Sequence, residues 1–78
     1  MTDPAHLAEA RDLARNGQGR RVRERSGVSL EELAAAVGVS VVDVMAWELG
    51  EREPDGAAAV DYVRVVRGLT RQTGLDGA

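Results

Sequence analysis

The stretch LEELAAAVGVSVVDVMAWE, residues 30–48 of this 78-residue chain, predicts two short helices that cross at a tight turn. Ser29 and Ser40 each precede a helix-forming run, where a serine hydroxyl can accept a hydrogen bond from a free backbone amide. Gly38 lies between the runs and tolerates the left-handed backbone that such a turn requires. Ala34 is small enough for the second helix to cross it closely. Apolar residues suited to hold the pair together are Leu33, Val37, Val39, Val44 and Trp47.

Helical signals also surround this stretch, and no segment alternates with the period of two that indicates a strand. We expect an N-terminal helix from Thr2 or Asp3, with Pro4 in its first turn, that ends at Asn16-Gly17. Two more helices are expected over residues 19–26 and 56–70. The last of these carries one apolar face, and Tyr62 is expected at the edge of the core. The valines and leucine of this face are Val60, Val63, Val66 and Leu69, with Arg64, Arg67 and Arg71 outside it.

Composition excludes several classes of protein. The chain has no cysteine and one histidine, His6, so it cannot form disulfides or a cysteine or histidine metal cluster. Its first residues lack a signal peptide, and no apolar run reaches the length of a membrane span. Asp43 and Glu48 do not face each other well enough for a catalytic acid pair. We therefore expect an intracellular protein of the bacterial cytoplasm or nucleoid, with no enzymatic activity, no metal and no cofactor.

The basic residues are all arginine, and lysine, isoleucine and phenylalanine are absent. This bias matches the codons of a GC-rich genome, which indicates an actinobacterium or a phage that grows in a similar host. The net charge of −3 argues against a nonspecific coat protein for nucleic acids.

Together with the residues that flank it, the central stretch resembles the lambda-repressor-like, or XRE-type, helix-turn-helix domains of phage repressors and bacterial regulators. The resemblance covers about residues 19–69 and implies a compact all-α domain of four to five helices that binds a double-stranded DNA operator, usually as a homodimer. We expect an N-terminal helix extension at 1–17, the helix-turn-helix domain at 18–70 and a flexible tail at 71–78. The matching motifs are Arg20-x-x-Arg23, Gly27-Val28-Ser29, Glu32-Leu33-Ala34, Gly38-Val39-Ser40, Trp47-Glu48-x-Gly50 and Arg52-x-Pro54.

The resemblance also implies roles for single residues. Arg23 and Glu48 match an internal ion pair with a structural role. Ser29 and Arg52 match positions near DNA phosphates, and Arg20 and Arg21 flank the motif on a side where phosphates would lie. The recognition helix would run from Val41 to Leu49. The residues of this chain that match the family's base-contacting positions are Ser40, Val41, Val42, Met45 and Ala46.

The apolar character of these base-edge positions leaves two functions open. Proteins read base edges mainly through hydrogen bonds, whereas valine can contact only a thymine methyl. The first interpretation is a sequence-specific regulator, such as a small repressor, a Cro-like protein or a phage control protein, that occupies its operator. The second is a protein-interaction module, such as an adaptor, an antitoxin or an anti-repressor, that uses Val41, Val42 and Met45. Residues 27–49 carry four acidic and no basic side chains, which favours a protein partner, whereas the flanking arginines favour phosphate.

Overall fold

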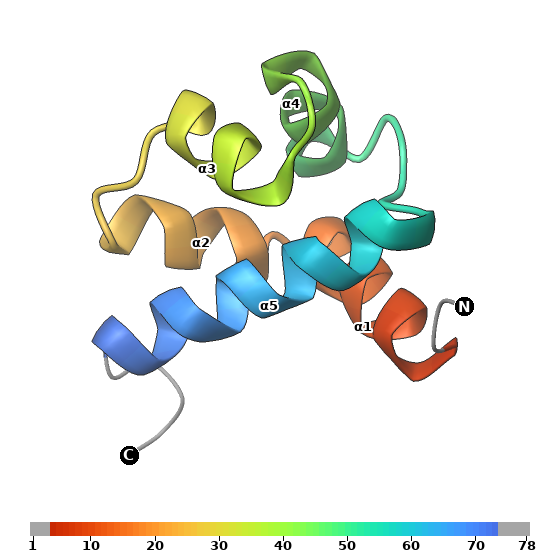
Figure 1. Ribbon diagram of the computed structural model, residues 1–78, viewed down its shortest axis with the longest axis horizontal. Coiled ribbons are helices and arrows are strands. Elements are labelled where there is room, and N and C mark those ends of the chain that lie inside the picture. Colours follow the sequence, from red (N-terminus) through yellow and green to blue (C-terminus); the bar gives the residue numbers. More distant parts are fainter. Residues whose placement is uncertain (1–3, 74–78) are drawn as a thin grey trace.

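Five α-helices make up residues 4–73, the part of the chain that the computed structural model describes (Figure 1). They are α1 (Pro4–Arg15), α2 (Gln18–Arg25), α3 (Leu30–Val37), α4 (Val41–Leu49) and α5 (Gly56–Thr73). No strand occurs within these residues, and the predicted all-α fold is confirmed. In Figure 1, α3 and α4 lie together above α2 and α5, and α1 packs against α5, α2 and α4.

The ends of the central helices follow from their capping residues. Ser29 Oγ accepts a hydrogen bond from the Glu32 amide at 3.0 Å, and Glu32 Oε1 accepts one from the Ser29 amide at 2.9 Å. This reciprocal pair lowers the pKa of Glu32 through its hydrogen bonds to Ser29. Ser40 caps α4 in the same way, since its Oγ accepts from the Asp43 amide at 3.2 Å. The predicted serine caps and the left-handed turn at Gly38, with φ of 86°, are therefore confirmed.

The outer helices differ slightly from the prediction. Helix α2 begins at Gln18, one residue early, and α5 continues to Thr73 rather than ending near Thr70. Residues 71–73 contain neither glycine nor proline, so nothing in them breaks the helix. The predicted cap at Asp3 and the rest of the expected tail, residues 74–78, lie outside the described residues.

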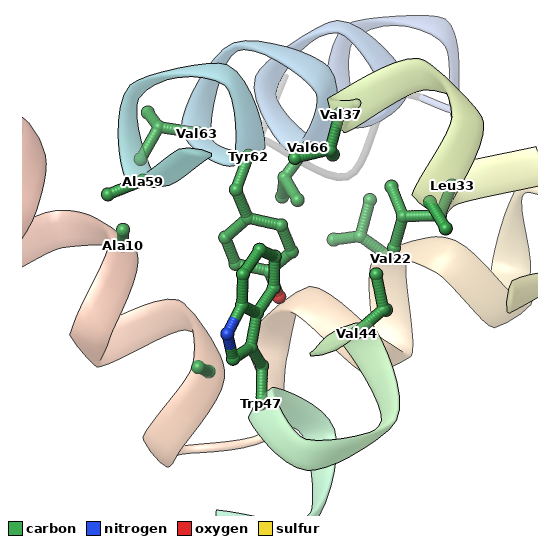
Figure 2. Close-up of a cluster of buried hydrophobic side chains, with 12 residues drawn as sticks. Ala10, Val22, Leu33, Val37, Val44, Trp47, Ala59, Tyr62, Val63 and Val66 are labelled. Carbon is green, nitrogen blue, oxygen red and sulfur yellow. The ribbon is translucent and has the colours of Figure 1, made fainter. Parts of the chain in front are cut away.

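The core draws apolar side chains from all five helices (Figure 2). Trp47 is buried as predicted, and its ring meets that of Tyr62 edge-on with the centroids 5.2 Å apart. The expectation for Tyr62 was wrong: it is fully buried rather than at the edge of the core. It can enter because Gly19 of α2 has no side chain where the phenol lies. Burial raises the pKa of Tyr62 to about 12.

The buried face of α5 is therefore shifted from the predicted one. Val63 and Val66 are buried as expected, whereas Val60 and Leu69 are only partly buried. The buried residues of α5 recur at the spacing of one helical face, and they are Ala59, Tyr62, Val63 and Val66.

Helix α1 belongs to the same core. Ala10 and Ala14 are buried, and Glu9 pairs with Arg67 of α5, with Glu9 Oε2 accepting from Arg67 Nε at 2.9 Å. Arg11 lies 2.9 Å from a carboxylate oxygen of Glu53 in the turn before α5. None of the helices in residues 4–73 has the length and apolar character needed to cross a membrane.

Candidate nucleic-acid interface

The crossing of α3 and α4 fixes how α4 is presented to solvent. The amides of Gly38 and Val39 both donate to the carbonyl of Ala34, at 2.8 and 3.0 Å, and this closes the turn between the helices. Ala34 itself is buried, as expected for the residue at the point of closest approach. Val44 and Trp47 face the core, so the opposite side of α4 faces outward.

A bidentate ion pair joins α2 to α4. Arg23 Nε and Nη2 donate to the two carboxylate oxygens of Glu48 at 2.7 and 3.0 Å, and Arg23 Nη1 donates to the Val28 carbonyl at 3.1 Å. Both side chains are largely shielded, with 12% of Arg23 and 6% of Glu48 exposed. The hydrogen bond to Glu48 raises the pKa of Arg23 above its ordinary value. The pair therefore fixes the orientation of α4 relative to α2.

The outward side of α4 is apolar. Val42, Met45 and Leu49 are exposed by 68%, 43% and 62%, and their spacing of three and four residues places them on one face. Leu30 and Arg20 lie at one edge of this face, where they line a shallow depression together with Met45 and Leu49.

The structure divides the predicted base-reading residues into two groups. Ser40, Val42 and Met45 are exposed. Val41 is half-buried and packs against the core, and Ala46 is buried. The buried methyl group of Ala46 is not accessible from outside the protein. Fewer of the predicted base-contacting residues are therefore exposed than the sequence suggested.

Arg52, in the turn between α4 and α5, is paired with α4 itself. Its Nη2 donates to Asp43 Oδ1 at 2.5 Å, and this hydrogen bond holds the pKa of Asp43 below its ordinary value. About half of the Arg52 side chain remains exposed. This pair was not predicted from the sequence. Its only signal was the opposite charge of two residues that the Gly50 turn brings back toward each other.

The two arginines at the start of α2 lie on different sides of the helix. Arg20 faces the α4 side and donates from Nε to Glu24 Oε2 at 3.2 Å. Arg21 instead lines a depression with Gln18 and Arg25. Ser29 is exposed at the start of α3. Of the residues predicted near phosphates, Arg20 and Arg52 thus lie beside α4, whereas Arg21 lies on another side of α2.

Contacts with arginines offset part of the acidic charge of residues 27–49. Glu48 and Asp43 are paired with arginines from outside this segment. Glu32, whose pKa is lowered by the helix cap, stays ionised, and it is exposed together with Glu31 at the first turn of α3. The negative charge that remains lies at the start of α3, and the acidic residues of α4 are paired.

Comparison with known proteins gives one match. A sequence model of a family described as helix-turn-helix matches residues 20–72. This range takes in most of α2, all of α3 and α4, and nearly all of α5, and it leaves α1 outside. No curated protein and no solved structure matches the chain.

Proposed function

The chain belongs to the helix-turn-helix family of the lambda-repressor-like, or XRE, type and is a DNA-binding regulator; from this premise we propose that it is a small repressor that acts by occupying its operator. The observation that carries the proposal is the outward face of α4, which Arg20 and Arg52 border and which the Arg23–Glu48 pair holds in place. We propose no catalytic role, since the family is one of DNA-binding regulators.

We propose that Val42 and Met45 enter the major groove and that Ser29, Arg20 and Arg52 contact phosphates. Apolar side chains discriminate thymine by its methyl group, so specificity also depends on DNA shape and on the placement of the phosphate contacts. Because one α4 face of this size makes few base contacts, the proposed active form is a homodimer that binds two half-sites.

A second candidate function follows from the same face. Val42, Met45 and Leu49 form an exposed apolar strip that would suit a protein partner. Titration of the 15N-labelled protein with its own upstream DNA, followed by amide shifts, separates the two functions. Shifts at Ser29, Ser40–Met45 and Arg52 support the repressor. An absence of shifts there at low salt would refute it and favour the protein-binding module.

Arg52→Ala is expected to weaken binding to operator and to unrelated DNA alike, by about tenfold, because it removes a charge-assisted phosphate contact. The slope of log affinity against log salt should become shallower by about 1 per subunit, or about 2 for the homodimer. Val42→Ser should instead reduce the preference for thymine-containing sites while nonspecific affinity stays nearly unchanged. Fluorescence anisotropy over a salt series measures both effects. Arg64→Ala, on the exposed side of α5, is the matched control and should leave binding unchanged; an Arg52→Ala variant that loses only operator binding would contradict the phosphate assignment.

Asp43→Asn is expected to tighten DNA binding by about threefold to tenfold, since it removes a negative charge beside the phosphates and frees Arg52. The salt slope should steepen by about 1 per subunit. Asp61→Asn, which removes a carboxylate beside Arg64 of α5, is the control for a general change in net charge. Weaker binding of Asp43→Asn would show instead that Asp43 orients Arg52 toward the DNA.

A further inference from the structure

Three arginines differ from the rest in their surroundings. Arg11, Arg15, Arg20, Arg23, Arg52, Arg64 and Arg67 each lie within 4.0 Å of a carboxylate. Arg21, Arg25 and Arg71 are exposed and form no ion pair with any residue in the described range 4–73. Within the described residues, a chain with a net charge of −3 thus leaves three cations without a carboxylate partner.

These three arginines lie around Gln18. Arg21 and Arg25 line one open depression of about 340 Å³ with Gln18, and Arg71 lines an adjoining one of about 280 Å³ that also includes Gln18. Leu13 of α1 and Val66 of α5 contribute apolar surface to the second depression, which the Glu9–Arg67 ion pair and Thr70 also line. We name this surface the arginine groove, defined by Leu13, Gln18, Arg21, Arg25, Val66 and Arg71.

The arginine groove faces away from α4. Successive residues of an α-helix are rotated by about 100°, so Arg21 and Arg25 each lie about 200° from Arg23 around the axis of α2. Because Arg23 points to Glu48 of α4, the other two point to the opposite side of α2. A partner in the groove would leave the outward face of α4 free.

We propose that the arginine groove binds an acidic amphipathic helix of a partner protein. Guanidinium groups pair with carboxylates through two parallel hydrogen bonds, and three of them without internal partners provide complementary charge. The apolar surface at Leu13 and Val66 would accept the apolar side chains of such a helix, which a phosphate backbone does not offer. A second copy of the chain fits less well, because a two-fold contact through the groove would bring like-charged arginines together.

The test uses a labelled synthetic peptide of about 16 residues, long enough to form a helix, with leucines on one face and glutamates beside them. A matched peptide carries lysine in place of every glutamate. At about 0.1 M salt, where charge attraction acts over about 10 Å, the full-length protein is expected to bind the acidic peptide and not the lysine peptide. The double variant Arg21→Glu/Arg25→Glu should bind it at least about tenfold more weakly, because attraction becomes repulsion.

Arg64→Glu is the matched charge reversal outside the groove, and it should leave peptide affinity unchanged apart from the effect of net charge. Amide shifts should map to Leu13, Gln18, Arg21 and Arg71. Equal binding by the double variant, shifts confined to Val42 and Met45, or no binding by the wild type would each overturn the proposal. Loss of DNA binding in the folded double variant would assign the groove to nucleic acid instead. Unchanged DNA binding together with lost peptide binding separates this inference from the repressor function.

Discussion

Replacing Glu48 with alanine is expected to lower the free energy of unfolding by about 3 kcal/mol, the lower end of the range for removing one partner of a buried ion pair, because the Arg23–Glu48 pair is partly buried. The guanidinium of Arg23 would remain with only 12% of its side chain exposed and would lose both charged hydrogen bonds. Its remaining contacts are the neutral Val28 carbonyl and an exposed Glu24 carboxylate oxygen at 4.0 Å, which balances the charge only weakly. A domain of this length has a total stability of about 4–12 kcal/mol, so the loss amounts to about a quarter of it or more.

Thermal unfolding followed by circular dichroism measures this effect. In a domain of this size a loss of 1 kcal/mol lowers the Tm by about 4–8 °C, so Glu48→Ala should melt more than about 12 °C below the wild type. Asp12→Ala removes the exposed pair with Arg15 and should cost no more than about 0.5 kcal/mol, which makes it the control. Replacing both Arg23 and Glu48 with leucine or methionine should restore much of the stability, because no buried charge is left unpaired. A Tm for Glu48→Ala within a degree or two of the wild type would contradict the structural role of the pair.

The parts of the fold that were predictable depend on local chemistry. A serine before a helix and a glycine after it act within a few residues, and Ser29, Gly38 and Ser40 lie in the predicted positions with the predicted geometry. The Arg23–Glu48 pair was expected only through the family resemblance, since nothing in residues 23–48 alone brings these side chains together.

The parts that were missed depend on contacts between distant residues. Tyr62 is buried because a glycine 43 positions earlier leaves space for its ring, and the spacing within α5 carries no trace of this. The Asp43–Arg52 pair depends on the direction in which the chain leaves Gly50. The different sides occupied by Arg20 and Arg21, by contrast, follow from helical periodicity once α2 is oriented by Arg23. At the candidate interface, the sequence therefore indicated which residues were near α4 but not which charges remained available to DNA.

Gly19→Ala is expected to destabilise the protein by about 2–3 kcal/mol, the cost of overpacking a well-filled core. A Cβ at this position would lie 2.0 Å from the Tyr62 hydroxyl oxygen and 3.0 Å from its ring carbon Cζ. The ring is rigid, fully buried and in contact with Trp47, so it has no room to move aside. In an open helix the same change would stabilise by about 1 kcal/mol, so the sign of the effect reports the contact directly. Gly68→Ala supplies that comparison, since a Cβ there meets nothing within 4 Å, and it should raise the stability.

A double-mutant cycle with Tyr62→Phe isolates the contact. The Tyr62 hydroxyl is buried with no hydrogen-bond partner among the described residues, so Tyr62→Phe alone should change the stability by less than about 1 kcal/mol. In the Gly19→Ala background the same change removes the 2.0 Å clash and leaves only the milder one at the ring carbon. It should therefore recover about 1–2 kcal/mol, which urea unfolding monitored by Trp47 fluorescence can resolve as a coupling energy. Additive effects of the two substitutions would mean that Gly19 and Tyr62 do not touch. They would contradict the packing of α5 against α2, which supports the position of α4.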